Sequence, residues 1–342
     1  MALIVIAFMS AMRVLVVPRS SRDRVARIVF LAVRRALTFW VWRSASYYRA
    51  DRLMAWYAPS ALLALVFVWL VLVLIGYTSV FLALGAHNVH DALTLSGSSL
   101  LTLGFASPGE ALGRTLVSFT ESATGLVLIA LLIAYLPTIY SAFSRREASV
   151  GMLEVRAGSP PSAVELLARY NRIHGLDELG ELWTRWEQWF QELEETHTSL
   201  AALNFFRSPS PERSWITAAG TVLDSASLAA SSLNIPRNPR AELCIRAGYL
   251  ALRHIAVFFS IPHNPEPRPD DPISISRAEF DDVYSRLRSE GVPLKSDIDQ
   301  CWRDFAGWRV NYDATLLALA QLTMAPVAEW VSDRGPLEQP RG

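Results

Sequence analysis

The segment Ala92–Phe105 reads ALTLSGSSLLTLGF and ends in Thr102, Leu103, Gly104 and Phe105. Its 14 residues are too few to cross a bilayer, which takes about 20, and suit a segment that enters and leaves the membrane on one side. Backbone N–H and C=O groups are tolerated at membrane depth only inside protein or beside a water-filled cavity. The chemistry that this pattern offers is therefore that of bare peptide groups facing an aqueous path.

Two longer apolar stretches flank that segment. Leu53–Ala86 and Ser122–Ser144 contain no Asp, Glu, Lys or Arg, and each is long enough for a transmembrane helix. A third stretch, Ala2–Val17, barely reaches the minimum length and contains Arg13. It lacks the basic start and the small-residue cleavage site of a signal peptide. We therefore expect three spans, the first of them an uncleaved anchor whose arginine reaches the interface.

The arginines give the orientation of these spans. Nine arginines lie within residues 18–52, and Arg145 and Arg146 directly follow the last span, whereas the loop between the long spans carries only Arg114. By the positive-inside rule, the arginine-rich segment and everything after the last span face the cytoplasm. Residues 24–40 place arginines opposite apolar side chains at helical spacing. This predicts a basic amphipathic helix on the membrane surface, in preference to a voltage sensor.

This order of elements, with Thr102-Leu-Gly-Phe after the short apolar run, resembles the pore-loop potassium channels over about residues 57–143, roughly a quarter of the chain. Their filter reads Thr-Val-Gly-Tyr-Gly, with Leu and Phe variants, and carbonyls from four such loops replace the water around the ion. The resemblance implies that the carbonyls of Thr102, Leu103, Gly104 and Phe105, with the Thr102 hydroxyl, coordinate K⁺. It also implies that Leu103 and Phe105 pack against the pore helix. Gly104 suits this role because the carbonyls can share one axis only if some residues adopt a positive φ.

Ala106 takes the fifth place of the filter, where the family has Gly, and Ser107 stands in place of an acidic residue. Because an alanine in the left-handed region costs about 1 kcal/mol or more, we expect weaker K⁺ selectivity than in the family. The resemblance further implies a homotetramer whose third span lines the inner cavity. In that span Gly125 is a candidate hinge, and Pro137, which removes a backbone hydrogen bond, is a candidate gate. Both residue types are also ordinary in membrane helices.

Residues 147–342 have the composition of a soluble helical domain. Trp183, Trp186 and Trp189 recur at helical spacing among other apolar residues, which favours a packed core over a ligand site. No alternation typical of strands occurs, and helices are expected at about 213–233, 240–260, 276–289 and 295–332. No GxGxxG, P-loop, HExxH or GxSxG motif is present, so neither a dinucleotide-binding domain nor an enzyme is indicated.

The composition agrees with a membrane protein, since 51% of the residues are hydrophobic and 19% are charged, against about 25% charged in soluble proteins. The sequence predicts an all-α membrane protein with three parts: an anchor and interfacial helix (1–52), a pore domain with re-entrant pore helix and filter loop (53–146), and an α-helical cytoplasmic domain (147–342). We expect a homotetrameric channel for K⁺ or other monovalent cations in the plasma membrane. Its expected partners are lipid and an unidentified cytoplasmic regulator, and no cofactor, metal site or nucleic-acid partner is indicated. The alternative is a non-conducting, membrane-anchored scaffold or sensor with a degenerate pore loop.

Overall fold

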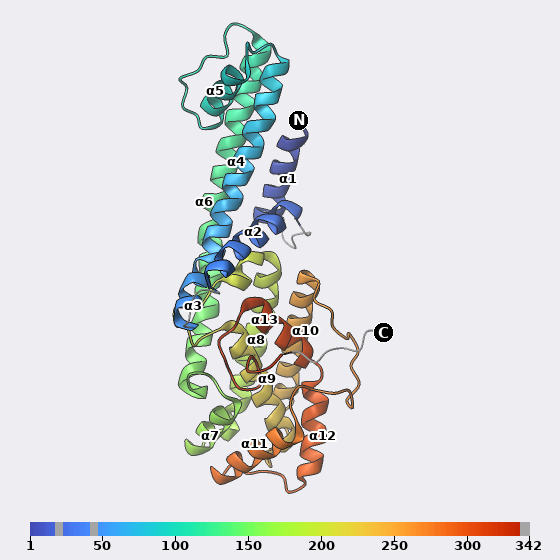
Figure 1. Ribbon diagram of the computed structural model, residues 1–342. Coiled ribbons are helices and arrows are strands. Elements are labelled where there is room, and N and C mark those ends of the chain that lie inside the picture. The colour runs from blue at the N-terminus through green and yellow to red at the C-terminus, as the bar shows by residue number, and fades with distance from the viewer. Residues whose placement is uncertain (18–22, 42–46, 336–342) are drawn as a thin grey trace. The chain divides into compact units, whose positions relative to one another are not determined.

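The computed structural model describes residues 1–17, 23–41 and 47–335, and within them every regular element is a helix (Figure 1). The only strand-like pairing among the described residues is an isolated bridge between Leu233 and Leu294. The predicted all-helical fold is therefore confirmed.

Arg19, Arg22 and Arg43, which belong to the predicted basic segment, lie outside the described residues. In chain order the elements are α1 (Ala2–Leu15), α2 (Arg24–Val41), α3 (Tyr47–Ala55), α4 (Tyr57–Ala83), α5 (Val89–Leu100), α6 (Leu112–Ala157), α7 (Ala163–Arg172), η1 (Leu176–Glu178), α8 (Leu179–Ser199), η2 (Ala201–Phe205), α9 (Trp215–Ser232), α10 (Pro239–Phe259), α11 (Arg277–Ser289), α12 (Ile298–Arg309) and α13 (Asp313–Thr323).

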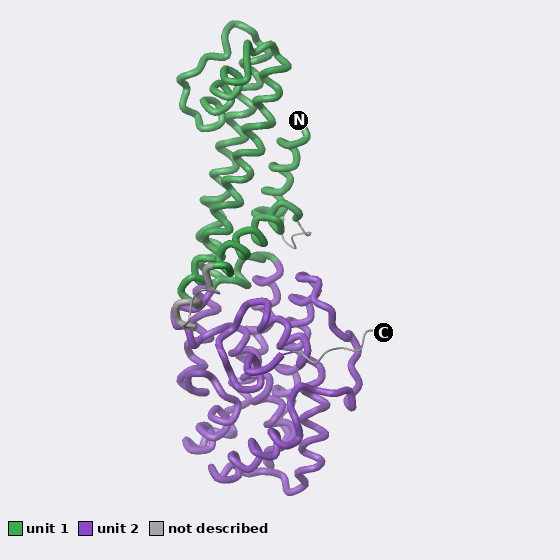
Figure 2. Tube along the Cα trace, in the orientation of Figure 1, with its two compact units in different colours: residues 1–142, 199–206 green, residues 143–198, 207–342 purple. Residues whose placement is uncertain are grey.

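The chain divides into two compact units (Figure 2). Unit 1 contains residues 1–142 and 199–206, and unit 2 contains residues 143–198 and 207–342. The change of unit after residue 142 falls inside α6, four residues before the end of the predicted pore domain. The membership of 199–206 in unit 1 has no counterpart in the sequence prediction, which assigned that segment to the C-terminal domain.

Two helical stretches of the described residues are long and apolar enough to cross a membrane, Asp51–Ala83, which contains α4, and Leu112–Ala157, which is α6. The helix α1, where the first of the three spans was predicted, is shorter than a membrane span. It has 14 residues, about 21 Å at about 1.5 Å per residue, whereas the hydrocarbon core is about 30 Å thick. The helix α6 continues beyond the predicted end at Ser144 because the residues that follow are also good helix formers.

Within unit 1, α1 packs against α4 in the antiparallel direction. Gly76 makes room for this contact, because a Cβ there would lie 2.6 Å from Cγ1 of Ile4. Further along both helices, Nε1 of Trp69 donates to the hydroxyl of Ser10 over 2.9 Å. Trp69 is fully buried, so this bond satisfies an indole N–H that would otherwise be stranded in an apolar contact.

The amphipathic helix predicted near residues 24–40 is α2. Asp23 begins it, since its carboxylate accepts from the backbone N–H of Ala26 over 2.8 Å and so caps the positive end of the helix. Val29 is buried in unit 1, and the carbonyl of Phe30 accepts from the hydroxyl of Tyr57 over 3.3 Å. Part of the apolar face of α2 therefore lies on α4, whereas Ile28, Leu31 and Phe39 remain exposed.

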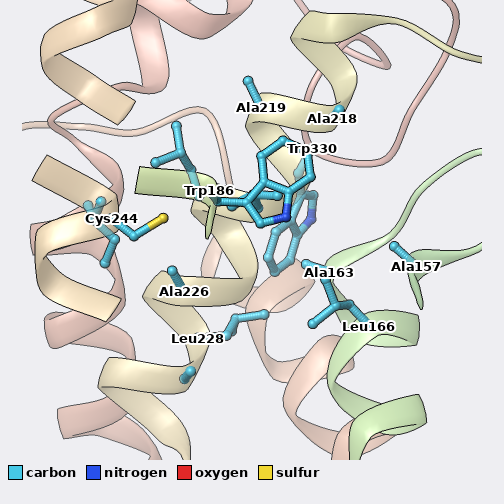
Figure 3. Packing of buried hydrophobic residues seen from close by; sticks show 14 of the residues in the cluster. Ala157, Ala163, Leu166, Trp186, Ala218, Ala219, Ala226, Leu228, Cys244 and Trp330 are labelled. Carbon is cyan, nitrogen blue, oxygen red and sulfur yellow. The ribbon is translucent and has the colours of Figure 1, made fainter. Parts of the chain in front are cut away.

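Unit 2 is built around α9, in which every residue except Ala230 is buried. Its many small residues let α7, α10, α12 and α13 approach closely, and Figure 3 shows Ala218, Ala219 and Ala226 of α9 inside this core. The three tryptophans of the predicted stripe are buried in the same core. Their interpretation as core residues is therefore confirmed.

The helix predicted over 295–332 is instead two helices, α12 and α13, and the reason lies in a buried ion network. Arg309 at the end of α12 is 0% exposed. Its guanidinium donates to Asp224 of α9, to Asp313 over 2.7 Å and to the carbonyl of Trp330 over 2.6 Å. The hydroxyl of Tyr312 also donates to Asp224, over 2.9 Å. The break between the helices lets both helix ends converge on one carboxylate.

Candidate functional site

The predicted re-entrant run forms α5 and the loop after it. The side chain of Asn88 begins the helix by accepting from the backbone N–H of Asp91 over 2.8 Å, which is the usual role of an N-cap asparagine. The helix ends where Thr102 adopts a φ of +54°, a conformation that stops α-helical hydrogen bonding. The loop 101–111 then leads into α6.

The helix α5 is held by a stripe of four residues on α6: Ser118, Glu121, Ser122 and Gly125. Their spacing of i, i+3, i+4 and i+7 places them on one face of the helix. Ser118 shares a hydrogen bond of 2.6 Å with the Ser99 hydroxyl, and Ser122 donates to the Ser99 carbonyl over 2.8 Å. The small hydroxyl side chains of this stripe both permit a close helix contact and bond across it.

The same face of α5 bonds to Glu121 and α4. The Ser96 hydroxyl lies 2.5 Å from Oε1 of Glu121 and 3.2 Å from the carbonyl of Leu74. Glu121 is 0% exposed. Glu121 was not among the predicted site residues, because it directly precedes the charge-free stretch Ser122–Ser144 and marked only the start of that stretch. An acidic residue on the edge of an apolar helix was the available signal.

In the predicted filter, Thr102, Leu103, Gly104, Phe105 and Ala106 share one short loop that is folded back onto α5. The amide of Thr102 donates to the Ser99 carbonyl over 3.1 Å, and that of Leu103 donates to the Ser98 carbonyl over 2.8 Å. The Ser98 hydroxyl accepts from the amide of Ala106 over 3.1 Å. Three of the amide groups in this loop are thus bonded to the end of the helix.

The carbonyls of residues 102–105 in the same loop, by contrast, have no backbone or side-chain hydrogen-bond donor in the described ranges. Gly104 adopts a φ of +73°, as expected if successive carbonyls are to share a direction. The loop also adjoins the C-terminal end of α5, where the helix dipole is negative. Free carbonyls beside a negative helix end are suited to binding a cation.

Two expectations about side chains in this loop are wrong. Leu103 and Phe105 do not pack against α5, since their side chains are 60% and 68% exposed; hydrogen bonds join α5 to α4 and α6 instead. Ala106 is not among the residues with a positive φ. The predicted strain at that position is therefore absent from this conformation of the loop.

The two candidate gating residues lie in different surroundings. Gly125 touches the end of α5, since a Cβ there would lie 3.0 Å from Cδ1 of Leu100 and would also overlap the Leu100 carbonyl. Pro137 lies about three turns further along α6, which runs through it as one helix. The structure thus brings Gly125 together with the predicted filter, and Pro137 stands apart from it.

No protein-family profile, no curated protein and no solved structure matches this chain. The functional assignment therefore rests on the geometry of the loop 101–111 and of the helices that hold it.

Proposed function

We propose that the chain is one subunit of a homotetrameric channel for monovalent cations, of the potassium type, in the plasma membrane. The observation that carries this proposal is the contrast within the loop after α5. The amides of Thr102, Leu103 and Ala106 are bonded to α5, whereas the carbonyls of residues 102–105 have no donor in the described part of the chain. Such carbonyls can replace the hydration shell of a cation when four loops surround one axis.

The helices around the loop support the same function. The two stretches long enough to span a membrane flank the short helix and the loop directly. In a bilayer, a non-helical loop of this kind is tolerated only beside water or within protein. An aqueous path along the loop meets that condition.

Exposed apolar side chains support an assembly of several copies. Leu103 and Phe105 are exposed beside the loop, and exposed apolar residues continue along α6 at Leu112, Leu116, Phe119, Leu126 and Ile133. Lipid or neighbouring subunits must cover such a surface. One filter loop per chain requires four chains for a closed ring of carbonyls. Positive-inside orientation puts the residues after α6 in the cytoplasm, where unit 2 would gate or assemble the pore.

Reconstitution tests the proposal directly. The purified full chain is placed in liposomes loaded with K⁺, and uptake of ⁸⁶Rb⁺ is followed while native mass spectrometry gives the number of subunits. We expect selective Rb⁺ uptake and a tetramer. Absence of uptake together with a monomeric or dimeric mass would reject the channel.

A pair of glycine variants adds a matched control. Gly104 and Gly85 both have positive φ values, +73° and +86°, and neither has an atom within 4 Å of an added Cβ. Alanine therefore introduces similar backbone strain at both positions, but only Gly104 lies in the proposed filter. Gly104→Ala should abolish conduction and leave the tetramer intact, whereas Gly85→Ala should conduct. Equal conduction by both variants would show that the filter assignment is wrong.

A second candidate is a non-conducting membrane-anchored scaffold or sensor. Ala106 and Ser107, which depart from the family pattern at the outer end of the filter, favour it. Unit 2 has a core of its own and could serve such a role without a pore. A tetramer that takes up no Rb⁺ would select this candidate.

A further inference from the structure

Glu121 is a buried carboxyl group with an incomplete set of partners. Its Oε1 lies 2.5 Å from the Ser96 hydroxyl, and its Oε2 is buried without any hydrogen-bond partner. No arginine, lysine or histidine within the described ranges forms an ion pair with it. An ionised carboxylate in this position would be a buried charge compensated by one hydroxyl group, which is a very unfavourable state.

The other titratable groups on α4, α5 and α6 do not supply a partner for the Glu121 carboxyl group. On α6, Arg114 lies two turns away and its guanidinium rests against Gly109. On α5, His90 and Asp91 lie at the far end of the helix and are exposed. On α4, the only titratable group facing this part of α6 is the Tyr77 hydroxyl, which bonds to Thr120 over 3.4 Å.

The single hydroxyl hydrogen of Ser96 gives an independent indication that Glu121 is protonated. The Ser96 hydroxyl lies within hydrogen-bond distance of both Glu121 and the carbonyl of Leu74. The Leu74 carbonyl also accepts from the Thr78 hydroxyl. A serine hydroxyl has one hydrogen and cannot donate to two acceptors at once. If the Glu121 carboxyl carries a proton and donates it to Ser96, then Ser96 can donate to Leu74 and both contacts are hydrogen bonds.

We infer that Glu121 is a neutral carboxylic acid whose proton links α6, through Ser96 of α5, to the carbonyl of Leu74 on α4. This chain of bonds attaches α5, the helix that holds the predicted filter loop, to both α4 and α6. Ser96 is two residues from Ser98, whose hydroxyl and carbonyl hold the amides of Ala106 and Leu103. Glu121 is thus a positioning residue that sets where α5 holds the carbonyl loop. This last role rests on the proposed function, whereas the protonation state does not.

Infrared spectroscopy of the purified full chain tests the protonation state without any need for conduction. At neutral pH the wild-type protein should show the C=O stretch of a protonated carboxylic acid, and Glu121→Gln should remove it. Glu110→Gln, at an exposed position in the loop, should leave it in place. Ser96→Ala should shift the band to higher frequency, because the acid loses its acceptor. A wild-type spectrum without the band, or a band that survives in Glu121→Gln, would overturn the inference.

The positioning role is tested by the ratio of K⁺ to Na⁺ permeability in liposomes. The glutamine amide can still donate to Ser96, so Glu121→Gln should keep the wild-type ratio. Glu121→Leu has similar bulk and no donor, and should lower the ratio by about tenfold, the effect of one lost hydrogen bond. An unchanged ratio in Glu121→Leu would reject the positioning role. A wild-type protein that conducts nothing would instead reject the proposed function, and the infrared result would still stand.

Discussion

The carbonyl of Leu100, the last residue of α5, lies so close to Gly125 of α6 that a Cβ at position 125 would overlap its oxygen. Glycine at this position therefore has a packing explanation that is separate from the predicted hinge. It lets the backbone of α6 pass beside the end of α5, immediately before the carbonyl loop. Small residues serve the same purpose wherever membrane helices approach closely.

Gly125→Ala should destabilise the contact between α5 and α6 by about 1–3 kcal/mol, the usual cost of forcing extra atoms into a packed site. Gly113→Ala is the matched control on the same helix, because nothing lies within 4 Å of an added Cβ there. That change should be neutral or stabilising by up to about 1 kcal/mol through helix propensity. Thermal unfolding of both variants in detergent gives the comparison. Equal unfolding temperatures would show that the contact is not tight in solution.

The sequence predicted the helices and the loop, but not the side-chain contacts that hold the loop. Periodicity and charge-free length were enough for α4, α5 and α6, because each is a local property of the chain. The stripe that includes Ser118 and Glu121 depends on which face of α6 meets α5, and that is a tertiary relationship. The burial of Arg309 could not be predicted either, because its carboxylate partner Asp224 comes from α9, 85 residues away in the sequence.

The packing of residues 199–206 into unit 1 is a further case. Residues 199–206 read SLAALNFF and carry no charge, but eight residues are far fewer than the roughly 20 of a membrane span, so the sequence prediction left them in the C-terminal domain. Their assignment to unit 1 follows from contacts such as that of Phe205 with Tyr57.

His197 of α8 should make unit 2 sensitive to acid. Its ring is fully buried, Nε2 accepts from Nη1 of Arg146 over 3.3 Å, and Nδ1 donates to the Leu193 carbonyl over 3.0 Å. Burial lowers the pKa of His197 well below its ordinary value of 6.5, and the charge of Arg146 lowers it further. The folded protein therefore holds this histidine neutral, while the unfolded chain binds a proton below pH 6.5.

The resulting stability is complete above pH 6.5 and is lost as the pH falls towards the lowered pKa of the folded state. The loss approaches about 1.4 kcal/mol per pH unit. His197→Gln should remove this part of the pH dependence, as measured by denaturant unfolding between pH 7 and pH 5 (roughly the range over which histidine titrates). His254→Gln removes a histidine that is 53% exposed and should leave the dependence in place. Parallel pH profiles for wild type and His197→Gln would contradict the assignment.

Among the charged residues of unit 2, Arg309 should be the one whose removal lowers the free energy of unfolding the most. Removing it strands the carboxylates of Asp224 and Asp313 in the core, where both are buried. Breaking a buried ion pair from one side typically costs about 3–5 kcal/mol, so Arg309→Met should lower the free energy of unfolding of unit 2 by about that amount. Near-ultraviolet circular dichroism of the tryptophan-rich core is a suitable signal for the measurement.

Arg277→Met is the control for that change. Arg277 pairs with Asp281 and Asp299 over 2.7 Å each, but all three side chains are at least 39% exposed, and surface pairs contribute about 0–1 kcal/mol. The double variant Arg309→Met/Asp224→Asn should recover part of the loss, because it removes one of the two stranded charges. No recovery would indicate that Arg309 acts through packing and not through its charge.

Phe205 should hold the segment 199–206 on α4. Its ring centre lies 5.3 Å from that of Tyr57 and 6.5 Å from that of Phe30, and aromatic pairs of this kind contribute about 0.5–1.5 kcal/mol beyond the area that they bury. Phe205→Ala should therefore raise amide hydrogen exchange in residues 199–206 by roughly tenfold, because local opening becomes easier by about that energy. Phe258→Ala disrupts an aromatic pair on α10 in unit 2 and should leave exchange in 199–206 unchanged. Equal protection of the segment in wild type and Phe205→Ala would show that the buried side chain of Leu203, and not the aromatic cluster, fixes it.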